Sequence, residues 1–277
     1  MPTFDTPESL SAVVEFDLGT ARIIASKRLD TVVSVLPSDG RRDVDVKAAE
    51  QTEVSFSNGR LVVRGPKTRT LFGKSGSLEI SIELPSGSDV QGKAAAGVFT
   101  AEGRLGDCRF ESAAGDIRVG EAGAAYLKTE SGDIRLERAT GDVDVAGAGR
   151  VDLGSIEGAA TVKNLTGDTN LGEVTGALRL NSLTGRVSVG VAHADVEAKS
   201  EDGPIKIGEV ARGQVNVEAT HGSLEVGVSS ASAAWLEVNS TAGTVHNSIG
   251  SAGPGPGAES VKVRAHTVVG DIVISRV

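Results

Sequence analysis

Apolar and polar residues alternate along most of the chain, and glycine divides the alternation into short runs. A typical run is glycine, a variable residue, then an aliphatic, a variable and an aliphatic residue, as in Gly115-Asp116-Ile117-Arg118-Val119. A period of two turns one side chain inward and the next outward, which predicts half-buried strands of about five residues. Nine such glycines lie 17, 17, 18, 18, 18, 19, 21 and 27 residues apart, at Gly115, Gly132, Gly149, Gly167, Gly185, Gly203, Gly222, Gly243 and Gly270.

A second alternating run precedes each of these glycines, so that one repeat holds two strands and two turns. Gly176, for example, precedes Leu178 and Leu180, and a further inward position is expected in the turn at Val174. A short fixed period indicates that each repeat buries its apolar face by stacking on its neighbours. Sequential hairpins would give the same alternation, but the near-constant step favours an all-β solenoid with coils of about 18 residues.

The repeat divides the chain into two predicted regions. Residues 96–277 form the β-solenoid repeat region, and Ser251–Gly257 is a flexible insertion before the last strands. Residues 1–95 do not keep the period and form an N-terminal β-rich cap with one short helix near Asp43–Gln51. Such a cap would cover the open sheet edge at the end of a solenoid.

Composition narrows the class of protein. Aromatic residues make up 3% of the 277 residues, as expected for a thin core of stacked aliphatic side chains, and the net charge of −9 argues against nucleic-acid binding. The lone cysteine, Cys108, excludes a disulfide framework and occupies an inward position, which predicts a buried thiol. No apolar run reaches the roughly 20 residues of a membrane helix, and the N-terminal residues lack a signal-peptide pattern. We therefore expect a cytoplasmic protein without direct membrane insertion.

Several sequence motifs of this chain resemble those of a known family. These are Ser-Ala-Ala-Gly-Asp-Ile-Arg-Val at 112–119, Thr-Glu-Ser-Gly-Asp-Ile-Arg-Leu at 129–136, Ile-Glu-Leu-Pro-Ser-Gly-Ser at 82–88 and Val-Gly-Asp-Ile-Val-Ile at 269–274. With them the chain resembles, over nearly its whole length, the bacterial β-strand-repeat family of proposed adhesins that is also called the toastrack domain. The resemblance implies a β-solenoid without an established activity, with some relatives in envelope-stress systems tied to membrane proteins.

Candidate chemical groups do not form a catalytic constellation. Aspartates follow many corner glycines, but the nine-residue calcium-binding word is absent, and aspartate is a favoured turn residue that bonds nearby backbone amides. The four histidines are expected on the surface, and no nucleophile motif frames a serine. Trp235 either packs at the end of the stack or serves as a sugar platform; packing is the interpretation we favour. We predict no catalytic residues, metal site or cofactor, and do not expect a small-molecule ligand.

One loop differs from its surroundings. Within Lys67–Gly76, Leu71 and Phe72 lie between Arg69 and Lys74 in an otherwise acidic protein. The apolar pair either folds back against the cap or docks a partner, with Phe72 as the anchor and Arg69 and Lys74 contacting an acidic rim. The candidate partner-binding residues are therefore Arg69, Leu71, Phe72 and Lys74.

Three functional hypotheses follow. The first is a non-enzymatic interaction scaffold or regulatory β-solenoid that binds a protein partner or further copies of itself. The second is a carbohydrate-binding or carbohydrate-active β-helix protein. The third is a cytoplasmic component of an envelope-stress or membrane-associated regulatory system. A deep pocket with converging charged groups would favour an enzyme over a scaffold.

Overall fold

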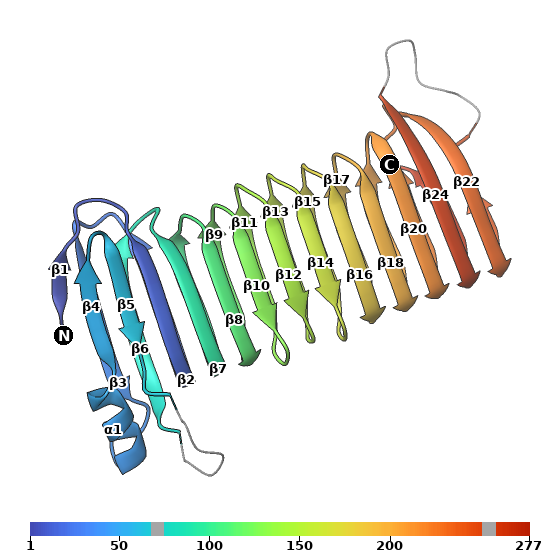
Figure 1. The fold of residues 1–277 in the computed structure, drawn as a ribbon. Helices are drawn as coiled ribbons and strands as arrows, with labels where there is room; N and C mark the ends of the chain where they lie inside the picture. Colours follow the sequence, from blue (N-terminus) through green and yellow to red (C-terminus); the bar gives the residue numbers. More distant parts are fainter. Residues whose placement is uncertain (68–74, 251–258) are drawn as a thin grey trace. The chain divides into compact units, whose positions relative to one another are not determined.

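The protein is nearly all-β. The computed structural model describes residues 1–67, 75–250 and 259–277, and these belong to two compact units, Met1–Glu137 and Arg138–Val277 (Figure 1). In both units the strands are stacked as coils of a β-solenoid, which confirms the predicted fold class. The predicted boundary near residue 95 lies inside the first unit, where β2 (Ser11–Ser26) pairs with β7 (Asp89–Arg104). A division into a cap and a repeat region at this residue stays a prediction.

The first unit combines coils with a mixed N-terminal end. Its remaining elements are β1 (Thr3–Asp5), β3 (Asp30–Pro37), α1 (Asp43–Glu50), β4 (Glu53–Ser57), β5 (Arg60–Arg64), β6 (Ser77–Pro85), β8 (Cys108–Ala114), β9 (Ile117–Ala122), β10 (Ala125–Thr129) and β11 (Ile134–Ala139). The helix matches the prediction to within one residue. Strand β2 is itself a coil strand, because it pairs in parallel with β5 and β6 on one side and with β7 on the other.

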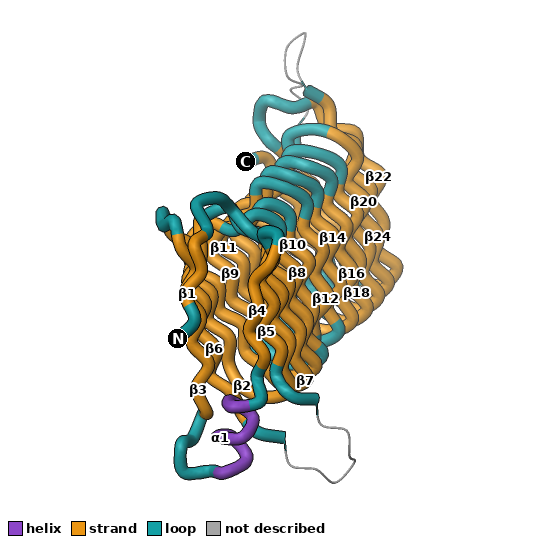
Figure 2. Tube along the Cα trace, turned by 60° about the vertical axis from the view of Figure 1, so that its left-hand side comes forward, coloured by secondary structure: helices purple, strands orange, loops and turns teal. Residues whose placement is uncertain are grey.

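Antiparallel strands lie at the N-terminal end of this unit, and α1 lies beside β3 and β6 (Figure 2). Strand β4 pairs antiparallel with β5, β3 pairs antiparallel with β6, and β1 pairs antiparallel with β3. The rings of Phe4 on β1 and Phe56 on β4 lie 5.3 Å apart, so apolar contact joins the two outer strands. The antiparallel pairing distinguishes these strands from the parallel coil strands of the same unit.

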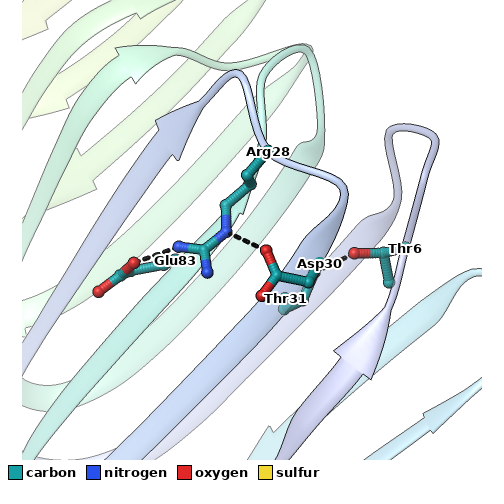
Figure 3. A network of polar contacts seen from close by, with 5 residues as sticks. All are labelled: Thr6, Arg28, Asp30, Thr31 and Glu83. Atoms are coloured by element: carbon teal, nitrogen blue, oxygen red, sulfur yellow. Dashed lines mark hydrogen bonds and ion pairs between the residues drawn. The ribbon is translucent and has the colours of Figure 1, made fainter.

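A polar network links β1, β3 and β6 in the same region (Figure 3). Arg28 donates hydrogen bonds to Asp30 at 2.9 Å and to Glu83, and the hydroxyls of Thr6 and Thr31 are 2.8 Å apart. The Arg28 guanidinium lowers the pKa of the Asp30 carboxyl, chiefly through this hydrogen bond. The network fixes the short β1 strand and the β2–β3 turn against the stack.

The second unit is a regular solenoid. Its elements are β12 (Val143–Gly147), β13 (Val151–Ile156), β14 (Ala160–Asn164), β15 (Thr169–Val174), β16 (Leu178–Thr184), β17 (Val187–Ala192), β18 (Val196–Asp202), β19 (Ile205–Val210), β20 (Gly213–His221), β21 (Leu224–Val228), β22 (Ala233–Ala242), β23 (Val245–Asn247), β24 (Ser260–Val269) and β25 (Ile272–Arg276). They form an even-numbered sheet and an odd-numbered sheet, each parallel and each supplying one strand to every coil.

Matched residues stack between coils as the repeat predicts. Val187 pairs with Ile205, which pairs with Leu224, and all three are buried. The predicted inward turn position Val174 and the equivalent residues of two other coils, Ile156 and Val210, are fully buried. Strands such as β12 and β14 pair in parallel although another strand lies between them in the sequence. This pairing excludes a meander of hairpins, in which neighbouring strands would be antiparallel.

The last coil in the sequence is not the last coil in the stack. Strand β24 pairs with β20 on one side and with β22 on the other, and β25 lies likewise between β21 and β23. Val263 therefore has Val215, more than two repeats earlier in the sequence, and Leu236 as its partners. The expectation that stacking partners always lie one repeat apart is wrong for this coil, because the chain passes outward to β22 and β23 before its end fills the gap.

Hydroxyl groups secure the glycine corners of the coils. In each unit, a buried threonine at a stacked position donates to the carbonyl of a corner glycine on a neighbouring coil, whereas the hydroxyls of Ser182 and Ser200 have no such partner. Thr129 bonds Gly115 at 3.0 Å, and Thr267 bonds Gly222 at 2.9 Å. Neighbouring coils approach closely at these corners. The carbonyl of one corner glycine occupies the place that a side chain on the corner glycine of the next coil would need, so only glycine fits.

Candidate binding face

The outer face of the even-numbered sheet in the second unit carries polar side chains in aligned rows. Outward positions alternate with the buried valines and alanines of β18, β20 and β24. Strand register places Glu197, Asn216, Arg264 and Glu237 in one row, and Lys199, Glu218, His266 and Asn239 in the next. Parallel pairing brings neighbours within a row to about 4.8 Å spacing. The rows line an open cavity of about 490 Å³.

Trp235 stands at one end of this face. The tryptophan is 71% exposed, and register places it beside Lys262, which lies beside Gln214. These three side chains line a second cavity of about 730 Å³. The preferred interpretation of Trp235 as a packing residue is wrong, because its position on β22 is outward and the inward neighbour Leu236 takes the core side. We call the two cavities and their lining side chains the binding face.

Each carboxylate in the smaller cavity has a cationic partner. Lys199 Nζ lies 3.2 Å from Glu218 Oε2 and 3.7 Å from Glu197 Oε1, and Arg264 Nε lies 3.0 Å from Glu237 Oε2. The hydrogen bond to Glu218 is the main cause that raises the pKa of Lys199 above its ordinary value, which keeps the ammonium charged. The arrangement thus presents ion-paired charges, the amides of Asn216 and Asn239 and the imidazole of His266 to the cavity.

The corner aspartates act as acceptors for backbone amides. Asp116 Oδ1 accepts from the N–H of Asp133 at 2.9 Å, and Asp168 Oδ1 accepts from the N–H of Arg186 at 3.0 Å. The amides belong to the neighbouring coil, whereas the sequence pattern predicts amides of the local turn. These carboxylates therefore tie coils together. In the described ranges 1–67, 75–250 and 259–277, histidine, cysteine and acidic side chains form no group of three that could hold a metal ion.

Calcium should leave the thermal stability unchanged if the aspartates serve only as amide acceptors. A metal that bound the folded state alone would raise the melting temperature by mass action, and a chelator would reverse the rise. Thermal melts with millimolar calcium, with chelator and with neither should therefore coincide. A reproducible calcium-dependent rise would show that the corners bind metal.

Acid should weaken the inter-coil bonds of Asp271. The backbone N–H and hydroxyl of Thr244 donate to Asp271 Oδ1 at 2.8 and 2.7 Å, and these bonds lower the pKa of Asp271. Because the folded pKa lies below the unfolded value of about 3.9, the stabilisation is present above that value and disappears as pH falls through the folded pKa. The difference in melting temperature between wild type and Asp271→Ala should shrink over this acid range; a constant difference would contradict the assignment.

The remaining candidate residues are the cysteine, the histidines and the residues of the predicted docking loop. Cys108 is buried, and burial is the first cause that raises the pKa of its thiol to about 12, with the Asp107 charge second, so the thiol is unreactive. His221, His246 and His266 are exposed, as expected, and half-buried His193 lies 2.8 Å from Glu173. The predicted partner-binding residues Arg69, Leu71, Phe72 and Lys74 lie outside the described residues.

Sequence reasoning missed the binding face, although its signal was present. The alternation predicts which side chains of each strand point outward, but their rows become visible only when β22 is known to lie beyond β24. Without that order, Trp235, Lys262 and Gln214 are not neighbours. Within the part of the chain that the structure covers, no helix has the length and apolar character to cross a membrane.

Comparisons with solved structures show low sequence similarity over nearly complete chains. A proposed cell adhesion protein from Clostridium sporogenes is 14% identical, with 100% of this chain and 98% of that chain covered and a TM-score of 0.23. A proposed adhesin from Parabacteroides merdae is 10% identical, with 100% and 95% covered and a TM-score of 0.37. A proposed lipid-binding protein from Parabacteroides distasonis is 11% identical, with 100% and 95% covered and a TM-score of 0.33.

A family model gives the decisive match. No curated protein matches the sequence. The model described as Toastrack DUF4097 matches residues 17–275, which is nearly the whole chain and spans the coils of both units. The chain therefore belongs to the toastrack family.

Proposed function

We propose that this toastrack protein is a non-enzymatic interaction scaffold that holds a partner on the binding face. The exposed Trp235 beside rows of compensated charges carries the proposal. An exposed tryptophan supplies a large rigid contact area and is enriched among the residues that dominate binding energy. The neighbouring ion pairs and amides form the polar surroundings that such an anchor has in protein interfaces. Every residue of the binding face lies within the segment that matches the toastrack model, so the face is part of the family domain itself.

Capture of partners from native lysate tests this proposal. Trp235→Ala should reduce capture about tenfold or more, as expected for loss of an interface anchor. Leu165→Ala is the matched control, because Leu165 is 59% exposed and follows β14, with β16, β18, β20 and β24 between that strand and β22. Both variants should melt like the wild type. Equal capture by wild type and Trp235→Ala would contradict the proposal.

Carbohydrate binding is the second candidate, favoured by the same tryptophan. A sugar ring can stack on an exposed indole while Gln214 and Lys262, which line the same cavity, donate hydrogen bonds to its hydroxyls. A glycan array with wild type and Trp235→Ala would identify such a ligand. Glycan signals that are lost in Trp235→Ala would favour a sugar over a protein as the ligand. An array without such signals would favour the scaffold.

The loop identified from the sequence remains a separate prediction. If Leu71 and Phe72 dock a partner, the double variant Leu71→Ser and Phe72→Ser should lose capture and keep its melting temperature. If the two side chains are core residues, the melting temperature should fall instead, and the docking hypothesis would be wrong. A cytoplasmic location and a role in a membrane-associated regulatory system also stay predictions, which cell fractionation and identification of captured partners would test.

A further inference from the structure

The outermost coil of the second unit has two open sheet edges. Among the described strands, β22 pairs only with β24 (Figure 1), and β23 pairs only with β25. Each strand therefore has one side on which its backbone N–H and C=O groups have no partner among these strands. Both sheets of the solenoid end in the same coil, so the two open edges lie at the same end of the stack.

The core of this coil is also partly open. Val245 on β23 is 45% exposed, whereas its stacked neighbour Ile272 is fully buried. Leu236 and Val238 on β22 are partly exposed, whereas their neighbours on β24 are buried. The inward positions of the last coil thus present apolar side chains beyond the end of the stack.

The described strands at this end lack the residues that usually protect sheet edges. Natural edge strands carry lysine, proline or inward charges that prevent pairing with another chain. Between Ser229 and Gly250 the only Asp, Glu, Lys or Arg is Glu237, which is paired with Arg264 at 3.0 Å. Residues 259–277, one coil further in, contain five such residues. Depletion of charge next to exposed apolar groups is the compositional sign of an interface core.

We infer that this end binds the same end of a second copy, giving a closed two-fold dimer. An occupant must present two strand edges at the separation of β22 and β23, and an identical end meets this requirement. A two-fold axis perpendicular to the stack makes the facing strands antiparallel and closes both edges at once. The near absence of charge allows the end to meet its own copy without repulsion, although each chain has a net charge of −9.

The N-terminal end of another copy is a poorer occupant. In the first unit the outermost strands are antiparallel to their neighbours, β1 has three residues, and Phe4 contacts Phe56 across that end. Head-to-tail contact would also leave a free end in every assembly and produce open filaments. Assembly size thus separates the two arrangements.

Molecular mass in solution is the first test. Sedimentation or light scattering of the full chain at micromolar concentrations should give twice the 28.2 kDa of one chain. Val245→Lys, which places an unpaired ammonium in the interface, should give the single-chain mass. Ser188→Lys adds the same charge to an outward position of a middle coil and should remain dimeric. A monomeric wild type, open filaments or a dimeric Val245→Lys protein would each overturn the inference.

Hydrogen exchange locates the contact and detects misfolding. In the dimer, the outer-edge amides of β22 and β23 should exchange slowly, and dilution or Val245→Lys should make them fast. Amides of β24 should stay protected in Val245→Lys, which shows that the coil is still folded. A dimer whose β22 and β23 amides exchange fast would place the contact elsewhere and overturn the inference.

The dimer and the binding face fail separately. Val245 belongs to the inward positions at the open end, whereas Trp235 points outward on the binding face. Val245→Lys should therefore abolish dimerisation and keep partner capture, and Trp235→Ala should do the reverse. A Trp235→Ala protein that loses capture and stays dimeric is the result that both proposals expect. A wild type that dimerises but captures no partner would leave the end contact valid and contradict the proposed function.

Discussion

Val189→Asp should lower the melting temperature by about 10 °C, since a loss of about 3 kcal/mol or more is expected when an unpaired carboxylate is buried. Val189 is 2% exposed and pairs with Leu171 on one side and Ile207 on the other. The carboxylate would thus lie between two aliphatic side chains in the thin core between the two sheets. A lysine or arginine side chain on the outer face could not reach it there. Thermal or denaturant unfolding measures the loss.

Ser188→Asp is the matched control. Ser188 is the preceding residue of β17 and faces outward, beside Asn170 and Lys206. The same carboxylate at this position stays hydrated and has a lysine nearby, so the melting temperature should change by no more than a few degrees. Equal effects at positions 188 and 189 would show that the inward and outward faces are assigned the wrong way round.

Gly185→Val should destabilise the second unit by about 3 kcal/mol, because it combines backbone strain with a steric clash. The φ angle of Gly185 is 117°, which a β-branched residue rarely adopts. A Cβ atom at this position would lie 2.3 Å from the carbonyl oxygen of Gly167 on the neighbouring coil. The neighbour is backbone and cannot rotate away, so relief requires separation of the two coils.

Gly40→Val tests whether the loss depends on the corner. A Cβ atom at Gly40 would meet no other atom within 4 Å, and its φ is ordinary, so the same substitution should change the melting temperature little. Hydrogen exchange of the amides near Gly185 should rise only in the corner variant. If both variants melt alike, the close approach of the coils does not require glycine at position 185.

The periodic part of the fold is predictable because its cause is local and repeated. Every coil needs two alternating strands and glycine at a corner, so residues such as Val187, Ile205 and Leu224 identify their own stacking partners by position in the repeat. The short helix at Asp43–Glu50 also has a local cause, since its segment contains the good helix formers Ala48 and Ala49. Neither inference needs contacts between distant parts of the chain.

The ends of the stacks are not predictable in this way. The apolar residues of β2 indicate a strand, but nothing local indicates that it inserts between β6 and β7. Likewise the spacing of 27 residues before Gly270 indicates an insertion. It does not reveal that β24 returns to pair with β20. Alternation determines which side of a strand is inward, whereas coil order depends on which edge is free when the segment docks.

The candidate site depends on that order. The sequence by itself determined the all-β class, the coil length, the inward residues, the buried Cys108 and the family, because each follows from composition or from a pattern within one or two repeats. Only the tertiary structure decided that Trp235 joins Lys262 and Gln214 on one face, and that β22 and β23 form an open end. The reason is that β22 and β23 lie at the end of the stack, although β24 and β25 follow them in the sequence. The repeat period gives the length of each coil but not the order in which the coils are stacked.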